Sequence, residues 1–363
     1  MSRTLLCLSF VAGLMGNTAL ADAPRVAVDI APVHSLVARV MQGVGSPDLV
    51  IPSGESPHGF SMRPSSAKAL QEADIVFWVG HDLTPQLEDA IETLAEDAAV
   101  TELLESDGIT LLEFREGALF EAHHHDDHDE DAHAHDEDHD HEHEEPKTED
   151  HDHDHDHEEA GDHDNHDHDH DEAKAEDHDH EEHADHDHDG HDHGDHDPHA
   201  WLSPNNASVW LNVIAGQLSS VDPENAGAYF ANAAAARSEM DALAADVNAT
   251  LDPVRGSKFV VFHDAYQYFE NDFDFPASGA ISIGDASDPS PARIAEIQGR
   301  IREEGVDCVL AEPQFNQNLV ATLLEGTDAE TGVIDPLGAS LEPGPELYPQ
   351  LIRTMAKTLA SCL

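Results

Sequence analysis

Three histidines stand where a predicted strand ends or a predicted helix begins. His58 follows a strand in the segment GESPHGF, His199 precedes a helix in DPHAWLSP, and His263 ends a strand in VFHDAY. Ligands bind at the strand-end loops of parallel sheets, so we predict that these three imidazoles converge at one site between two lobes. Neutral imidazole is a ligand for zinc, copper and nickel. Taken singly, each histidine is more often a structural or surface residue than a ligand.

An acidic, histidine-rich tract runs from residue 123 to residue 197 and holds 25 of the 30 histidines. Its alternating His-Asp runs predict that the tract binds several metal ions weakly to moderately. The alternative is a solvated acidic linker, and the composition does not say which metal is bound. The predicted low-affinity ligands of the tract are His139, His141, His151, His153, His155, His166, His168, His186, His188 and His191.

The formal net charge of the chain is −61, and the tract supplies −34 of it from 36 acidic residues and two lysines. Such a charge excludes nucleic acid and anionic membrane surfaces as natural partners, because both would be repelled. The tract has almost no apolar residue larger than alanine, so burial cannot offset its ordering entropy. We therefore expect residues 123–198 to form an insertion that is disordered without metal.

The N-terminus has the pattern of a secretory signal peptide over residues 1–21. Arg3 is followed by an apolar run over residues 5–20 and by a small-residue site just before Asp22. The run is too short for a transmembrane anchor, and no later segment is apolar for long enough to span a bilayer. We expect an exported protein that is not inserted in the membrane.

Two cysteines remain in the mature chain, because Cys7 lies inside the predicted signal peptide. An exported protein usually joins two such cysteines, here Cys308 and Cys362, in a disulfide. The competing interpretation is that the two thiolates bind a metal. It is weaker because the compartment is oxidising and neither cysteine has a neighbour at ligand spacing.

Short apolar runs alternate with helical patterns on both sides of the tract, which predicts parallel sheets with right-handed crossovers. The predicted strands are residues 25–30, 48–51, 74–79, 258–262, 280–283, 307–311 and 332–334. The predicted helices are residues 33–42, 67–72, 204–218, 222–251 and 346–361, with one more that begins at residue 291.

The helix predicted over residues 222–251 is long enough to join two lobes. It has one apolar face, on which Ala236, Met240, Leu243 and Val247 follow one another at helical spacing. At 1.5 Å per residue its length is roughly 45 Å, which is more than one small domain needs. The predicted architecture is two small parallel-sheet α/β lobes joined by one long rigid helix. The predicted boundaries are residues 22–221 for the first lobe, 222–252 for the helix and 253–363 for the second lobe.

Four segments resemble one known family. They are PHGFSMRPS at residues 57–65, HAWLSP at 199–204, FHDAYQYF at 262–269 and AEPQF at 311–315. In these motifs the chain resembles the ZnuA-type zinc-binding proteins of ABC importers, within a wider family of metal-binding solute-binding proteins that also serves manganese. The resemblance covers essentially the whole mature chain and includes the internal acidic tract.

The resemblance implies a ligand set. His58 and His199 match metal ligands of the first lobe, and His263 matches a position that is histidine in zinc importers and glutamate in manganese relatives. Three imidazoles favour Zn²⁺ over Mn²⁺. Asp335 matches a fourth, carboxylate ligand, and water is the alternative. Some relatives carry an acidic residue before the first histidine, where this chain has Pro57.

The resemblance also implies a function. A periplasmic solute-binding protein would capture Zn(II) with high affinity in a cleft between the lobes and deliver it to the membrane permease of an ABC importer, without catalysing a reaction. A periplasmic zinc metallochaperone is a second expected partner, and the protein is expected to be a monomer. Cys308 with Cys362 matches a disulfide of some zinc-type relatives. A rigid connecting helix predicts capture without large lobe movement, and zinc affinity should fall below about pH 6 as imidazole is protonated.

Three other functions remain open. A zinc hydrolase would need a general base such as Asp264 or Glu312, but no His-Glu-x-x-His run is present. A zinc buffer would store ions on the tract and need no cleft, and a Mn(II) importer would use the same family fold. Of the two remaining histidines, His34 is interpreted as a packed or exposed helix residue. His81 follows a strand and is given no ligand role.

Overall fold

The computed structural model describes residues 23–115, 196–282, 290–315, 317–324 and 326–363. The predicted signal peptide and all ten predicted tract ligands lie outside the described residues. The described residues all belong to one structural unit, and every element below is part of it.

The first lobe is built on a parallel sheet with the strand order β2-β1-β3-β4. All four residues of β3 are buried, as expected for a parallel strand that is covered on both faces. Helices α1, α2 and α3 each have a proline in the first helical turn, where the missing N–H group costs nothing. The elements are β1 (Val26–Val28), α1 (Ala31–Val40), β2 (Asp48–Leu49), α2 (Pro64–Glu72), β3 (Ile75–Trp78), α3 (Pro85–Leu94) and β4 (Ala99–Glu102).

The second lobe repeats the plan with the strand order β6-β5-β7-β8, again all parallel. Strands β5, β6 and β7 are buried along their whole length. The elements are β5 (Phe259–His263), α6 (Gln267–Phe273), β6 (Gly279–Ser282), α7 (Pro291–Glu304), β7 (Cys308–Ala311), α8 (Gln317–Leu324), β8 (Glu330–Val333) and α9 (Leu347–Cys362).

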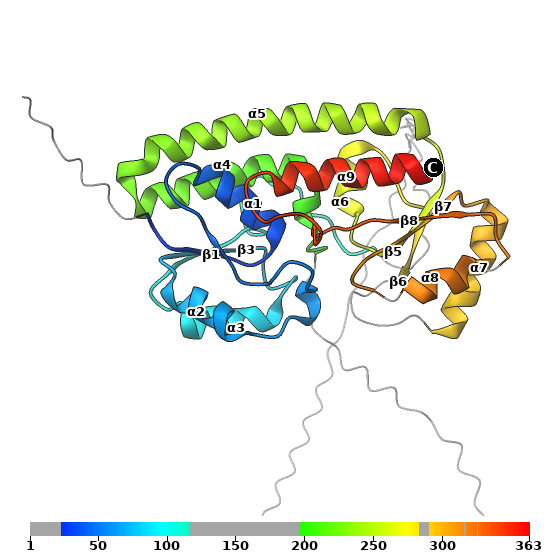
Figure 1. Ribbon diagram of the computed structural model, residues 1–363, viewed down its shortest axis with the longest axis horizontal. Coiled ribbons are helices and arrows are strands. Elements are labelled where there is room, and N and C mark those ends of the chain that lie inside the picture. Colours follow the sequence, from blue (N-terminus) through cyan, green and yellow to red (C-terminus); the bar gives the residue numbers. More distant parts are fainter. Residues whose placement is uncertain (1–22, 116–195, 283–289, 316, 325) are drawn as a thin grey trace, which may run out of the picture. The chain divides into compact units, whose positions relative to one another are not determined.

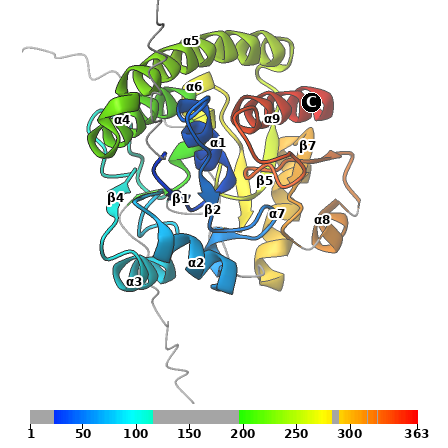
Figure 2. The same cartoon turned by 60° about the vertical axis from the view of Figure 1, so that its left-hand side comes forward.

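Two helices connect the sheets. Helix α4 (Pro204–Val221) leads through a short 3-10 turn into α5 (Ala226–Leu251). Both figures show α5 running beside α4 and α9 (Figures 1 and 2). The buried face of α5 includes Ala236, Met240 and Leu243, which are the residues of the predicted apolar face.

The last helix, α9, also packs against the first lobe. The backbone N–H of Tyr348 donates to the Ser35 hydroxyl at 2.9 Å, and the Tyr348 hydroxyl donates to the carbonyl of Trp201 at 2.9 Å. One hydrophobic core therefore runs through both lobes. It includes Phe77 of β3 and Leu310 of β7.

The predicted class, two parallel-sheet α/β lobes with a long connecting helix, is confirmed. Four short elements were not predicted, namely α3, β4, α6 and α8, because each spans only four to ten residues and gives a short pattern. The predicted insertion is too long at its C-terminal end. His196 forms an antiparallel bridge with Glu113, and Asp197 is 1% exposed, so residues 196–198 belong to the folded lobe.

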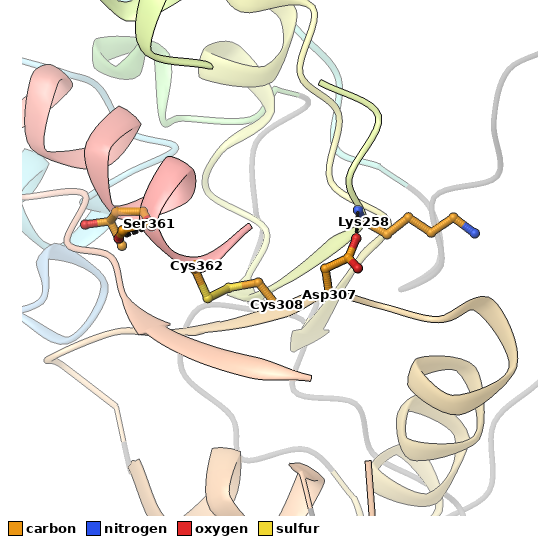
Figure 3. Close-up of a disulfide and its surroundings, with 6 residues drawn as sticks. Lys258, Asp307, Cys308, Ser361 and Cys362 are labelled. Atoms are coloured by element: carbon orange, nitrogen blue, oxygen red, sulfur yellow. Dashed lines mark hydrogen bonds between the residues drawn. A yellow bond between two sulfur atoms is a disulfide. The ribbon is translucent and has the colours of Figure 1, made fainter. Parts of the chain in front are cut away.

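The predicted disulfide between Cys308 and Cys362 is present, with a Cα–Cα distance of 5.7 Å. Figure 3 shows that it joins the first residue of β7 to the end of α9. A helix shared by both lobes is therefore covalently tied to the second sheet. Among the described residues, no helix is both long and apolar enough to cross a membrane.

Candidate metal centre

The three motif histidines come from three separate elements. His58 lies in a 3-10 turn between β2 and α2. His199 directly precedes the 3-10 turn Ala200–Leu202, and Ser203 then caps α4 by accepting a hydrogen bond from the Asn206 N–H group. His263 is the last residue of β5. Each imidazole is therefore held by backbone of defined geometry.

The structure brings these three rings together. The ring centroids are 5.4 Å apart for His58 and His199, 6.3 Å for His58 and His263, and 5.3 Å for His199 and His263. One ligand atom from each ring lies within 4.8 Å of the other two. Zinc–nitrogen bonds of 2.0–2.1 Å place tetrahedral ligands roughly 3.4 Å apart. Small rotations of the rings are therefore enough to bring all three nitrogen atoms within bonding distance of one ion.

Two of the imidazoles are oriented by buried carboxylates. The Nδ1 atom of His199 lies 2.7 Å from Oδ1 of Asp197, and the Nδ1 atom of His263 lies 2.6 Å from Oε1 of Glu312. Both carboxylates are 1% exposed. A carboxylate in its ionised form only accepts hydrogen bonds, so in that form each pair requires the proton on Nδ1 and leaves the lone pair of Nε2 for a metal ion. Carboxylate–histidine pairs of this kind orient the ligands of metal sites.

Burial raises the pKa of Asp197 to about 7, although the backbone N–H of His199 and the charge of Arg115 lower it. The same N–H donates to Asp197 at 3.0 Å. Asp197 therefore binds both the ring and the backbone of His199, and it fixes the position of this residue as well as its tautomer.

The rings border a small cavity of about 20 Å³. A space of this size holds one or two water molecules, so it is suited to a single ion. Apart from the imidazoles, its lining includes Trp201, Phe315 and Pro336. The centroid of the Trp201 ring is 5.2 Å from that of His199, and the centroid of the Phe315 ring is 5.2 Å from that of His263. These apolar side chains limit the access of water to the ligand atoms.

Asp335 is not part of the group of three, and its carboxylate organises the loop that borders the cavity. Oδ1 accepts hydrogen bonds from the N–H groups of Leu337 and Gly338 and from the Gln314 amide, while Oδ2 accepts one from the N–H of Ala339 at 2.6 Å. Since each carboxylate oxygen has two lone pairs, Oδ2 keeps the capacity for a further ligand bond.

The two carboxylates considered as general bases for a hydrolase both have other partners. Asp264 forms an ion pair with Arg115, and Glu312 binds the ring of His263. Asp264 does not line the cavity, whereas Glu312 lines it and is engaged with His263 through Oε1.

The other histidines lie elsewhere. His34 is buried in α1 with Nε2 at 3.1 Å from the carbonyl oxygen of Pro47, which fits its interpretation as a packed residue. The Nδ1 atom of His81 lies 2.6 Å from a carboxylate oxygen of Glu88 on α3. Neither residue belongs to the group of three.

Two residues of the site were not recognised from the sequence. Asp197 stands two positions before His199, and the Asp-Pro-His run is a local signal that could have identified it. Glu312 lies 49 residues from His263, and only the parallel pairing of β5 with β7 brings their ends together. No local pattern reveals that contact.

The chain is similar to known zinc-uptake proteins along nearly all of its length. The profile of the family described as "ZnuA: Zinc-uptake complex component A periplasmic" matches residues 26–362. The chain is 44% identical to the high-affinity zinc uptake system protein ZnuA of Brucella abortus (strain 2308), over 98% of this chain and 96% of that protein. It is 40% identical to the protein of the same name from Paracoccus denitrificans (strain Pd 1222), over 97% of each chain.

Solved structures share the fold. A crystal structure of ZnuA has a TM-score of 0.66 at 19% sequence identity and covers 94% of this chain and 99% of its own. The solute-binding protein FpvC of Pseudomonas aeruginosa, in complex with Mn²⁺, has a TM-score of 0.64 at 17% identity and covers 94% and 98%. Proteins of the matched family are transport components and not enzymes. This chain belongs to the ZnuA family of periplasmic zinc-uptake solute-binding proteins.

Proposed function

We propose that this protein captures Zn²⁺ with high affinity at the cavity between its two lobes and delivers the ion to the permease of an ABC importer. His58, His199 and His263 are the proposed ligands. The observation that most directly supports this proposal is that three imidazoles from separate elements have ligand atoms within 4.8 Å of one another. Two of these rings are also oriented by buried carboxylates.

Zinc is the proposed cargo because the site offers three nitrogen ligands. Imidazole binds zinc well, whereas manganese prefers sites that are richer in oxygen. The fold alone does not select the metal, since FpvC carries Mn²⁺ or Ni²⁺ in its solved structures.

The remaining functional assignments are part of the same proposal. The acidic tract binds additional zinc at lower affinity, and because it belongs to the same chain, its ions have a high effective concentration at the cleft. The protein works as a monomer in the periplasm and is exported by means of residues 1–21. A periplasmic zinc metallochaperone is a proposed second partner. These assignments rest on the sequence.

A chelator-competition titration with zinc tests the cleft site. The starting protein lacks residues 123–191, so that the histidines of the tract do not mask the cleft. The deletion must stop before Asp197, because this carboxylate holds His199. One tight site should remain. His58→Ala, His199→Ala and His263→Ala should each weaken it by more than the 10–100-fold loss that is typical for a residue that only supports a ligand.

His81→Ala is the matched control, because it removes an imidazole that also pairs with a carboxylate but lies outside the group of three. It should leave zinc affinity unchanged. If deletion of residues 123–191 itself abolishes tight binding, the protein is a buffer that stores zinc on the tract, and the proposed cleft site is wrong.

Asp335 is the proposed fourth ligand, with water as the alternative. Asp335→Asn keeps the size of the side chain but removes its charge and replaces one acceptor oxygen by a donor group. If Asp335 is a ligand, this substitution should lower zinc affinity by at least about tenfold. A lower melting temperature of the zinc-free protein with unchanged zinc affinity would assign the fourth position to water and leave Asp335 as the residue that organises its loop.

A further inference from the structure

A buried ion cluster lies next to the candidate metal centre. Arg115 donates from Nε to Oδ2 of Asp264 at 3.0 Å and from Nη1 to Oε2 of Glu270 at 2.7 Å. Its Nη2 atom contacts the second oxygen of each carboxylate. The side chains are 16%, 9% and 6% exposed for Arg115, Asp264 and Glu270. The guanidinium therefore binds two carboxylates at once, which is an arrangement that lysine cannot reproduce.

The cluster joins the two lobes. Arg115 ends the described part of the first lobe before the tract, whereas Asp264 follows His263 directly and Glu270 lies in α6. A second hydrogen bond also connects the two lobes, because the N–H of Leu112 donates to the hydroxyl of Tyr268 in α6 at 3.1 Å. The chain segment that leads into the tract is thus fastened to the second lobe.

Tyr268 of α6 is also connected to the segment that carries His199. The Tyr268 hydroxyl donates to the carbonyl of Asp197 at 2.7 Å, and the N–H of Asp197 donates to the carbonyl of Leu112 at 2.8 Å. The Asp197 side chain in turn binds His199. His263 and His199 are therefore linked through residues that do not touch the cavity, one by way of Asp264 and the other by way of Asp197.

We propose that Arg115 is a positioning residue for zinc capture, which keeps His199 and His263 at their binding separation before any ion is present. This inference rests on the proposed function. Ligands that are fixed in advance lose little freedom when the ion binds, and binding is tighter for that reason. Loosening the cluster lets the strand end that carries His263 move relative to the segment that carries His199.

A purely structural role is the competing explanation. A buried ion pair is weak evidence for stability, since the desolvation of its charges offsets much of its attraction. Burial raises the pKa values of Asp264 and Glu270, and Arg115 lowers them. The two roles differ in what they change. A structural role alters the melting temperature of the zinc-free protein, whereas a positioning role alters the geometry and lifetime of the metal complex.

The test compares Arg115→Lys with Arg39→Lys in the full-length protein, loaded with one equivalent of metal so that the tight site is filled in preference to the tract. Arg39 is a matched control because its side chain is 15% exposed and pairs with Glu239 between α1 and α5, away from the cavity. Three quantities are measured: the melting temperature without metal, the rate of zinc dissociation into excess chelator, and the visible spectrum of the Co²⁺-substituted protein. A second variant, Arg115→Met with Asp264→Asn and Glu270→Gln, removes all three charges of the cluster together, so that no buried charge of the cluster loses its partner.

Both Arg115 variants should release the tightly bound zinc about tenfold faster than the wild type, and their Co²⁺ bands should change in position or intensity. Arg39→Lys should match the wild type in both measurements. Unchanged dissociation and spectra in the Arg115 variants would overturn the inference, as would a change of the same size in Arg39→Lys. If the wild type itself holds no zinc tightly, the proposed function fails, and with it the inference that depends on it.

Discussion

At the scale of single residues, the candidate site consists of imidazoles whose orientation is set by carboxylates. Glu312 binds Nδ1 of His263, and Asp197 binds Nδ1 of His199. Both carboxylates are almost completely buried, and the desolvation of a charge is costly. A buried carboxylate that binds a ligand ring therefore costs folding stability and improves ligand orientation.

Glu312→Gln separates these two effects. The amide keeps the shape and can still accept a hydrogen bond from Nδ1, but the negative charge is lost. Zinc affinity should fall about tenfold because the imidazole becomes a weaker donor. The melting temperature of the zinc-free protein should stay the same or rise, because a buried charge has been removed.

The control for this prediction is Glu296→Gln, the same change on the solvent-exposed side of α7, where Glu296 pairs with Arg293. It should alter neither quantity. Wild-type zinc affinity in Glu312→Gln would show that the pair with His263 does not tune the ligand.

At the scale of elements, the ends of β1 and β3 are joined by a buried carboxylate. Asp29 accepts hydrogen bonds from the N–H groups of Ile30 at 2.7 Å and Val79 at 2.6 Å. Burial nevertheless raises its pKa to about 7 from an ordinary value of 3.8. Between these two values the folded state binds more protons than the unfolded state, so the stability that Asp29 contributes is lost as the pH rises toward 7.

Asp29→Asn should remove this dependence. The free energy of unfolding of the wild type minus that of the variant should decrease from pH 4 to pH 7. The decrease should be a few kcal/mol if the pKa of Asp29 is raised by the full amount of about three units. Urea unfolding at several pH values measures it. A difference that is constant with pH would mean that Asp29 titrates at its ordinary value in the folded protein.

The disulfide connects two elements that are 54 residues apart in the sequence, β7 and α9. In the chain-entropy model, a cross-link that closes a loop of this length lowers the entropy of the unfolded state and so adds about 4 kcal/mol to the free energy of unfolding. The double variant Cys308→Ala with Cys362→Ser should lose roughly 2–5 kcal/mol of unfolding free energy. Because the disulfide is remote from the histidines, zinc stoichiometry should not change. Equal stability of the reduced and oxidised wild type would contradict the prediction.

At the scale of the whole folded unit, one core passes through both sheets and α9 contacts both lobes. Wide closure of a hinge would have to break these contacts, so zinc should bind with little change in the distance between the lobes. Spin labels at Gln71→Cys in α2 and Glu303→Cys in α7, both on exposed residues, can report that distance. The mean separation should be the same with and without zinc, whereas a shortening of several ångströms would indicate hinge closure.

The sequence by itself determined the class of fold and the three histidines that the structure brings together. Both depend on local information: the alternation of apolar strands with helices, and short motifs in which His58, His199 and His263 each stand beside a strand end or helix start. Cys308 and Cys362 could be paired because the third cysteine, Cys7, lies inside the predicted signal peptide. Such patterns are visible without any knowledge of how distant segments meet.

Only the tertiary structure decided how the histidines are supported. The contact between His263 and Glu312 spans 49 residues, and the contacts of Arg115 with Asp264 and Glu270 span 149 and 155. The packing of α9 on the first lobe and the burial of Asp197 in that lobe also became visible only there. The physical reason is that parallel crossovers join residues that are far apart in the chain. The proposed ligands are thus encoded locally, whereas the charges that orient them arise from the fold.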